Sequence, residues 1–431
     1  MKVLYTLLAF GLLPLAASAQ TANVIPQKPK LPEPFATKSA KNFSKVKGWK
    51  DGQTPVAPKG FTVQLYVEDM QNPRNMYQLP NGDVLVAEAN TIKNTLMQAG
   101  AIVLGASKAE NMKTSANRIS ILRDADQDGK IETKEVFIDG LNQPFGILLL
   151  KDWLYVANTD GILRYRYKPG MLKMEGPGEK VTDLPANDRN QHWTRNLLAN
   201  ADGSKIYVSV GSVDNMGDNG KDVHPERACI LEMNPDGTGR RVYASGLRNP
   251  VGLGWAPGTK TLYTTVNERD ELGDELVPDY LTSVKEGGFY GWPWSYWGQH
   301  EDPRIADDAK RPDLVAKAIV PDVSLGSHTA SLGMAFYTGN AFPQQYRGGA
   351  FIAQHGSWNR SVLAGYKVVF VPFKNGKPSG PARDFLTGFK ASENEEKEVY
   401  GRPIGVLAMA DGSMLVTDDV NDRIWRIVAN K

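Results

Sequence analysis

The chain has 431 residues, of which 41% are hydrophobic and 23% are charged, which is the composition of an ordinary globular protein. Its formal net charge of +2 is spread along the chain without basic blocks, so the charge pattern does not indicate a nucleic-acid partner. The apolar runs are too short to predict a membrane span. Composition alone therefore decides little about function.

The N-terminus predicts export. Lys2 is followed by an apolar run over residues 3–15 and by the small residues 17–19, which match a cleavage site. We expect residues 1–19 to be a signal peptide and the mature protein to be periplasmic or secreted, the alternative being an ordinary N-terminal helix. Cys229 is the single cysteine and lies in an apolar segment, so we expect a buried thiol and no intramolecular disulfide.

Residues 20–58 carry many prolines and lysines with little periodicity, which predicts an extended leader along the surface or a partly disordered one. From residue 59 to 431 the sequence is rich in strand signals, and we expect a single domain there. Helical periodicity is confined to residues 91–104 and 390–399. The long non-repeating stretch 279–329 is an insertion of the kind that is usually functional.

Six segments of this domain repeat one plan: a polar or cationic residue, a strand, a tight turn, and a strand that ends in small polar residues. Turns such as Asn81-Gly82 suit hairpins. Repeats of this period indicate a radial architecture, and six strand-rich units predict an all-β, six-bladed β-propeller. We expect strands from both chain ends to close the ring within one blade. The segments start at Asn72, Asn142, His192, Arg248, Ser331 and Arg402.

The polar residues that open the repeats should converge at the propeller axis. Each residue is ambiguous alone, because an arginine or histidine at a strand start is as often structural as functional. Together they would crowd several cations around His192, which predicts an anionic ligand, and a near-neutral imidazole can take a proton from a substrate hydroxyl. The converging residues are Arg74, Gln143, His192, Arg195, Arg248, Asn249 and Arg402.

Two acidic segments are candidate calcium sites. Asp124, Asp126, Asp128 and Glu135 fit the calcium-loop spacing, with Gly129 at the sharp turn, but strands flank the loop instead of helices. We expect a calcium-binding hairpin loop, the alternative being a solvated acidic turn. Residues 267–275 are strongly acidic and predict either a second calcium near the axial pocket or an acidic surface turn. The aromatic residues of 287–294 suit either face packing or a binding cleft.

Several blocks, taken in order, resemble the soluble quinoprotein sugar dehydrogenases, which include soluble glucose dehydrogenase and the sorbosone dehydrogenase-like proteins. The resemblance runs from about Gly60 to Val428. The loop 124–132 and the block GLNQPFGI are more similar to the sorbosone branch. The blocks that carry the resemblance are GLNQPFGI (Gly140–Ile147), HWTRNL (His192–Leu197), GLRNPVGL (Gly246–Leu253), GDEL (Gly273–Leu276) and GGFYGWP (Gly287–Pro293).

The resemblance implies a propeller that holds pyrroloquinoline quinone (PQQ) over its axis with Ca²⁺ against the quinone. It implies oxidation of a sugar or sugar-derived aldehyde, aldose or sorbosone-like, by hydride transfer to the quinone, with electrons passing to a soluble acceptor such as a cytochrome. By the same resemblance His192 matches the general base, Arg248 matches a catalytic residue that polarises the quinone oxygens, and the metal falls near Arg269 and Asp270. Cofactor contacts are implied for Gln143, Arg195, Arg248, Asn249, Arg360 and Arg402.

Some positions depart from the family pattern. Gln191 stands where a carboxylate precedes the family's base, which leaves open what orients His192. His328 and His355 lie near repeat ends and could also reach the pocket, whereas Arg74 suits blade structure better than catalysis. Two alternatives remain: a calcium-dependent propeller lactonase, whose axial metal needs carboxylates, and a non-catalytic propeller that binds a ligand.

Overall fold

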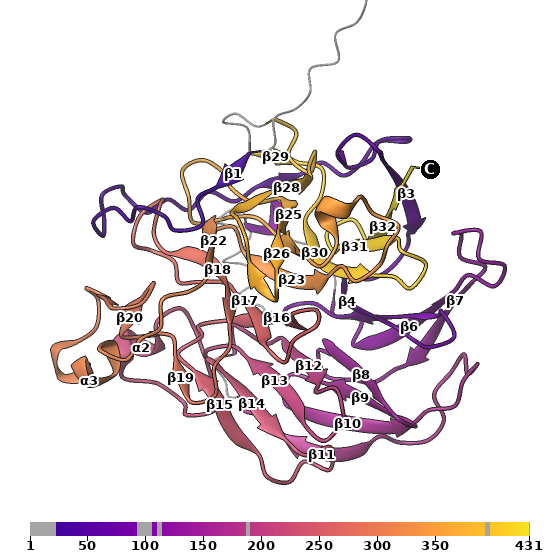
Figure 1. Cartoon of the computed structure of the whole chain (residues 1–431), viewed down its shortest axis with the longest axis horizontal. Coiled ribbons are helices and arrows are strands. Elements are labelled where there is room, and N and C mark those ends of the chain that lie inside the picture. Colours follow the sequence, from indigo (N-terminus) through magenta and orange to yellow (C-terminus); the bar gives the residue numbers. More distant parts are fainter. Residues whose placement is uncertain (1–22, 93–105, 110–113, 187–189, 393–396, 431) are drawn as a thin grey trace, which may run out of the picture.

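The computed structural model of the protein describes residues 23–92, 106–109, 114–186, 190–392 and 397–430. The fold is all-β and forms a six-bladed propeller, which confirms the prediction from the repeats. The innermost strand of each blade contacts the innermost strands of both neighbouring blades, so the ring is closed. In Figure 1 these innermost strands (β4, β8, β12, β16, β23 and β30) lie around the centre.

The first three blades follow one another along the chain as antiparallel sheets. Their middle strands are buried along nearly their whole length, because neighbouring blades cover both faces. The first blade contains β4 (Pro73–Gln78), β5 (Val84–Glu88), β6 (Arg118–Arg123) and β7 (Thr133–Ile138). The second contains β8 (Gly146–Leu150), β9 (Trp153–Ala157), β10 (Gly161–Arg166) and β11 (Glu179–Asp183). The third contains β12 (Arg195–Ala199), β13 (Ile206–Val210), β14 (Cys229–Met233), β15 (Arg241–Ser245) and the parallel β19 (Gly288–Phe289).

The other three blades complete the ring, and the last one joins the two ends of the domain. The fourth contains β16 (Pro250–Trp255), β17 (Leu262–Val266), β18 (Pro278–Ser283) and β22 (Val323–Ser327). The fifth contains β23 (Ser331–Phe336), β24 (Ala350–Gln354), β25 (Lys367–Val371), β28 (Ala382–Leu386) and β1 (Val24–Ile25). The sixth contains β30 (Pro403–Ala408), β31 (Met414–Asp418), β32 (Arg423–Ala429) and β3 (Phe61–Val67).

The expected closure of the ring is confirmed by the pairing of β3 with β32. The two strands run antiparallel from the pair Phe61 and Ala429 to the pair Val67 and Ile424. Figure 1 shows the N-terminal β3 in indigo beside the C-terminal β32 in yellow. The first and last strands of the domain are therefore hydrogen-bonded to each other within this blade.

Hydrophobic side chains fill each seam between adjacent blades. Between the second and third blades, for example, Leu148 and Tyr155 pack with Leu197 and Val208. Each of the other five seams has its own cluster of the same kind. Cys229 lies in the seam of the second and third blades as a buried, free thiol, as predicted. The fold thus rests on interlocked apolar seams between sheets.

Glycines in the inner strands let neighbouring blades approach at the axis. A Cβ atom on Gly405 would lie 2.3 Å from the carbonyl oxygen of Arg74, and one on Gly333 would lie 2.4 Å from that of Ile404. These glycines occupy the same position of the repeat, in RPIGVL and SLGMAF. The repeat therefore specifies the tight packing of the ring as well as its strands.

The described part of the leader, residues 23–58, runs in extended form over the blades. β1 pairs with β28, and β2 (Lys45–Val46) pairs with β29 (Glu398–Val399). The predicted signal peptide and nearly all of the predicted helix 91–104 lie outside the described residues. The helix predicted at 390–399 is wrong in the part that the structure describes, where a bridge at Lys390 and β29 occur instead.

Short elements complete the fold. The insertion 279–329 contains several of them, and none of the helices among the described residues has the length and apolar character needed to cross a membrane. The remaining elements are the helices α2 (Gly217–Gly220) and α3 (Pro312–Val315), the 3₁₀ turns Ala106–Lys108, Asp307–Ala309 and Gln344–Tyr346, and the strands β20 (Ser295–Tyr296), β21 (His300–Glu301), β26 (Phe373–Lys374) and β27 (Lys377–Pro378).

Candidate functional site

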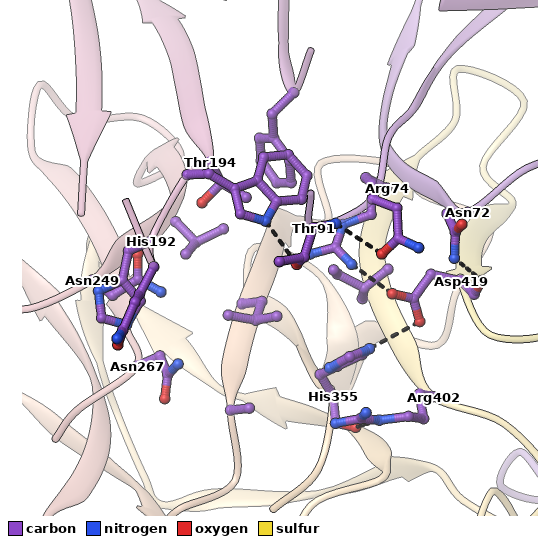
Figure 2. Close-up of a pocket in the computed structure, with 18 of the residues that line it drawn as sticks. Asn72, Arg74, Thr91, His192, Thr194, Asn249, Asn267, His355, Arg402 and Asp419 are labelled. Carbon is purple, nitrogen blue, oxygen red and sulfur yellow. Dashed lines mark hydrogen bonds and ion pairs between the residues drawn. The ribbon is translucent and has the colours of Figure 1, made fainter. Parts of the chain in front are cut away.

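A cavity of about 810 Å³ opens on the propeller axis, where inner strands begin and second strands end. Its floor is apolar and consists of Phe145, Val251, Leu332 and Ile404, which pack together from four different blades. Polar residues from the strand ends surround this floor. Figure 2 shows His192, Asn249 and Asn267 on one side, and Arg74, His355, Arg402 and Asp419 on the other.

His192 precedes β12 and lines the cavity, and its hydrogen bonds define its tautomer. Its Nδ1 lies 2.9 Å from Oγ of Ser212 and 3.2 Å from the carbonyl oxygen of the same residue. The Ser212 hydroxyl donates its only hydrogen to the carbonyl of Asp214 at 2.6 Å, so it can only accept from His192. Nδ1 therefore carries the proton, and Nε2 keeps its lone pair, with no hydrogen-bond partner among the described residues.

The surroundings of His192 keep its ring neutral. Burial and the positive charge of Arg248 hold the pKa of His192 well below its ordinary value, and the buried Arg227 and Arg195 add to the effect. A neutral imidazole with a free Nε2 is a competent proton acceptor at neutral pH. The hydroxyl and carbonyl oxygens of Ser212 therefore orient this histidine, in place of a carboxylate.

On the opposite side, Asp419 links Arg74 and His355. Its Oδ2 accepts from Nη1 of Arg74 at 2.5 Å, and its Oδ1 accepts from Nε2 of His355 at 2.9 Å. Burial works to raise the pKa of Asp419, but the hydrogen bond from His355 and the charges of Arg74 and Arg402 outweigh it, and the pKa lies below its usual range. Burial, with the charge of Arg402, lowers the pKa of His355 to about 4, so this ring is neutral.

Arg402 brings an uncompensated charge to the same side. It is 7% exposed and donates to the carbonyl oxygens of His355 (3.0 Å), Ala109 (2.9 Å) and Gly356 (3.1 Å). These bonds use three of its five N–H groups, and among the described residues it forms no ion pair with a carboxylate. Two N–H groups and the charge are left for a ligand.

The charges that line the cavity favour an anion. Three arginines and the His328 imidazolium, whose protonation is derived below, face two carboxylates, which leaves two positive charges in excess. Oδ1 of Asn249 is also buried at the wall without a hydrogen-bond partner. Buried polar atoms of this kind are normally satisfied, so a bound ligand would complete the site. The charged residues of the wall are Arg74, Arg248, Arg402, His328, Asp270 and Asp419.

Most of the residues predicted from the repeats or from the family resemblance come together in this cavity. They are Gln143, His192, Arg248, Asn249, Asp270 and Arg402, and His328 and His355 reach it as well.

Arg195 is a correction, because it does not line the cavity. It is fully buried at the start of β12 and turns back into a cage of carbonyl groups. It donates to the main-chain oxygens of His192 (2.8 Å), Thr194 (3.0 Å) and Pro185 (2.8 Å), and to Oδ1 of Asn190 (3.2 Å). Arg195 therefore supports the segment that carries His192 and has no N–H directed to a cofactor.

Arg360 and Arg269 are corrections for the same reason. Arg360 donates to the carbonyl of Asp274 at 2.8 Å and pairs with the Glu275 carboxylate, so it ties two loops together outside the cavity wall. Arg269 is 2% exposed and pairs with Asp302. Its Nη2 also donates to the main-chain oxygen of Asp270 at 2.7 Å. The calcium predicted at residues 269 and 270 does not fit these contacts.

The acidic loop of the first blade brings its three aspartates together with a different glutamate from the one that was predicted. Asp124, Asp126 and Asp128 lie with Glu132, and one ligand oxygen from each falls within 4.8 Å of the others. Glu135 belongs to β7, is paired with Ile121 and lies outside this group. The prediction of Glu135 as a ligand is therefore wrong, because the chain enters a strand before reaching it.

Sequence reasoning missed part of the wall. Arg74 lines the cavity, as its place in the repeat predicts, but its partner Asp419, the residue directly after β31, was not predicted. Trp358 at the rim stacks on Phe43 of the leader, with ring centroids 5.6 Å apart. A signal for Asp419 exists, since Asn90 and Asn267, which follow the second strands of two other blades, face the same cavity. The repeats carry no signal for this contact between the leader and the rim of the cavity.

Comparisons with known proteins agree with the fold. Residues 53–357 match the family described as "Domain of unknown function (DUF7133)", and residues 305–430 match the family described as TrAA12-like. The chain has the six-bladed fold found in the soluble PQQ-dependent sugar dehydrogenases. It belongs to the DUF7133 family.

Among curated proteins, an uncharacterised protein of Borreliella burgdorferi is 29% identical over 300 residues, covering 68% of this chain and 77% of that protein. Quinoprotein glucose dehydrogenase B of Acinetobacter calcoaceticus is 23% identical over 314 residues, covering 64% of this chain and 58% of that protein.

Two solved structures share the fold over 90% of this chain. The family AA12 enzyme of Trichoderma reesei has a TM-score of 0.71, 18% identity and 99% of its chain covered. The holo PQQ domain of pyranose dehydrogenase from Coprinopsis cinerea has a TM-score of 0.68, 20% identity and 100% of its chain covered. At these identities the likeness concerns the fold, and activity has to be argued from the cavity.

Proposed function

We propose that this protein is a PQQ-dependent dehydrogenase that oxidises a sugar or a sugar-derived aldehyde. The observation that carries the proposal is one cavity with two unlike sides. One side holds His192 as a neutral base, and the other holds Arg402 and Arg74. A base opposite a cationic wall suits a hydroxyl substrate beside an anionic cofactor. The relatives named for PQQ and the fold shared with such enzymes support the same assignment.

The residues present fit the cofactor. PQQ, when bound, supplies a quinone that accepts hydride from the substrate carbon. The two unused N–H groups of Arg402 suit one of its carboxylates, and the orphaned amide oxygen of Asn249 suits a polar atom of the ligand. The apolar floor that includes Phe145 and Leu332 suits the flat ring system. Each of these contacts would be made by a residue that lines the cavity.

His192 moves the proton in this proposal. Its Nε2 takes the hydroxyl proton of the substrate while its Nδ1–H stays on Ser212. The positive charge that forms on the ring is disfavoured by Arg248 and favoured by the Ser212 carbonyl, so the proton is passed on readily to solvent. Proton transfer by this route needs no carboxylate beside the histidine.

The remaining assignments are also proposals. The substrate is an aldose or a sorbosone-like sugar, and the electron acceptor is a soluble one such as a cytochrome. The N-terminal pattern supports a periplasmic or secreted location. Calcium is assigned to the acidic loop Asp124–Glu132, because its oxygens suit a hard cation. A lactonase has less support, because both carboxylates of the wall are paired with cations.

The test is a PQQ titration of the purified protein by calorimetry, followed by dye reduction with a panel of aldoses and sorbosone. We expect saturable binding and sugar-dependent reduction. His192→Asn should lower kcat by about 100-fold or more while PQQ affinity changes little, because the base acts on the substrate. His300→Asn, at an exposed position in β21, is the control. Absence of PQQ binding, or full turnover by His192→Asn, would contradict the proposal.

A further inference from the structure

Arg248 lies at one corner of the cavity with all five guanidinium N–H groups donated. Nη1 donates to the carbonyl oxygens of Glu268 (2.6 Å) and Asn267 (3.2 Å). Nη2 donates to Oδ1 of Asn215 (3.0 Å) and to Oδ2 of Asp270 (3.5 Å), and Nε faces the carbonyl of Asn215 at 3.4 Å. Carbonyl and carboxylate oxygens of this kind are the ligands that Ca²⁺ takes. The guanidinium therefore occupies the centre of the oxygen cluster where a metal ion would bind.

Asp270 offers no unused oxygen to a metal ion. Its Oδ1 lies 3.1 Å from Nδ1 of His328, and its Oδ2 faces Arg248. Its main-chain oxygen accepts from Nε (3.0 Å) and Nη2 (2.7 Å) of Arg269 and from Nδ2 of Asn215 (3.3 Å). Calcium at this position would have to break ion pairs and hydrogen bonds to buried groups, which is costly.

His328 is a second cation at the same corner. Its Nδ1 faces the Asp270 carboxylate, and its Nε2 lies 2.8 Å from the carbonyl oxygen of Gly273. Both partners accept hydrogen bonds, so both ring nitrogens carry hydrogen and the ring is an imidazolium. Burial works to lower the pKa of His328, but the hydrogen bond and charge of Asp270 outweigh it, and the pKa is raised. With Arg248 and Asp270, His328 forms a cluster of two cations and one carboxylate, and the buried carboxyl groups of Glu268 and Asp279 lie close enough to act on the charge of Arg248.

We propose that this protein binds its anionic quinone without calcium, and that the cluster of Arg248, Asp270 and His328 supplies the fixed positive charge beside the ligand. The proposal rests on the PQQ-dependent function proposed above. At an effective dielectric constant of about 20, two unit charges about 4 Å apart repel by about 4 kcal/mol, so a divalent ion next to two buried cations is disfavoured. Because Arg248 has no N–H left, it acts on the ligand through its charge.

The test measures PQQ affinity by calorimetry in excess EGTA and in excess calcium. The full chain carries Asp126→Asn in every arm, so that the acidic loop contributes no calcium signal. We expect the dissociation constant to differ by less than about threefold between the two conditions. Binding that requires calcium would overturn this inference and leave the proposed function standing. Binding in neither condition would overturn the proposed function itself.

Two variants separate charge from shape, both measured in EGTA. Arg248→Met should weaken PQQ binding by about 100-fold, because the buried charge beside the anion is lost. His328→Gln can still donate to Asp270 or to Gly273 but carries no charge, and it should weaken binding by about tenfold. Arg240→Met and His300→Gln make the same changes at residues outside the cavity wall and serve as the controls. Wild-type affinity in His328→Gln, or in a folded Arg248→Met protein, would overturn the inference.

Discussion

Arg227 lies directly behind His192, and its Nη2 donates to the main-chain oxygens of His192 at 3.3 Å and of Ser212 at 2.6 Å. Its Nε donates to Gly211, and no carboxylate among the described residues forms an ion pair with it. The guanidinium thus fixes the segments on both sides of the imidazole and sets a positive charge near the ring. This pairing explains how the site does without a carboxylate before His192.

Arg227→Met should raise the pKa of His192, because a positive charge near the buried ring is removed while the length of the side chain is kept. Proton NMR titration of the imidazole measures the shift, with His192→Asn assigning the signal. The acid limb of sugar oxidation should move to higher pH. Arg240→Met, which removes a partly exposed arginine paired with Glu226, should leave the titration unchanged. An unaltered His192 titration in a folded Arg227→Met protein would count against this role.

The neutral state of His355 predicts acid sensitivity. Its folded pKa is lowered to about 4 from an unfolded value near 6.5, so below about pH 6.5 the unfolded state binds a proton that the folded state does not. The free energy of unfolding should therefore fall between about pH 6.5 and pH 4, by up to about 3 kcal/mol from this residue. Urea unfolding across this range measures the slope. In His355→Asn this part of the slope should disappear, and an identical slope would refute the assignment.

Calcium in the acidic loop should stabilise the first blade. We expect the Tm to rise when calcium is added and to fall with EGTA, because a ligand that binds only the folded state stabilises it. Asp126→Asn should abolish the shift. Glu135→Gln is the matched control and should keep it, because Glu135 lies outside the carboxylate group. Scanning calorimetry checks all three proteins, and loss of the shift in Glu135→Gln alone would restore the original ligand assignment.

Gly405 tests the packing of the ring. An alanine here would place its Cβ against the carbonyl oxygen of Arg74, which is backbone and cannot move aside. Gly405→Ala should lower the free energy of unfolding by about 1–3 kcal/mol through overpacking. Gly380→Ala, whose added Cβ would meet the side chain of Pro372 at 3.1 Å, should change it by less than about 1 kcal/mol. Equal losses of unfolding free energy in the two variants would contradict a role for the contact between Gly405 and Arg74 in ring packing.

The repeats predicted the fold and part of the cavity wall because hairpin register is a local property. A residue that opens an inner strand lies at the mouth of the ring in every blade, so Arg248, Asn249 and Arg402 were found from their position in the repeat. Ser331 opens its repeat in the same way, but it is buried and binds Asp279. The register therefore gives the place of a residue along the axis and not the direction of its side chain.

The remaining errors come from direction and from distant partners. Arg195 turns away from the cavity because its Nη1 and Nη2 donate to the carbonyl groups of three nearby residues, which no spacing rule contains. Glu132 replaces Glu135 because the strand β7 begins between them. The pairing of Asp419 with Arg74 joins residues at opposite ends of the domain. Such contacts depend on ring closure, and the sequence of one repeat carries no information about them.

The pairing of β3 with β32 also constrains how the chain can be made. These strands stand at opposite ends of the domain, so β3 emerges from the ribosome early and finds its partner only after the last strand has been synthesised. Contacts this distant in sequence make folding slow. Until then β3 is an open strand edge of the kind that recruits foreign strands. A shortened C-terminus would leave that edge exposed permanently, and the five preceding blades would form a ring with a gap.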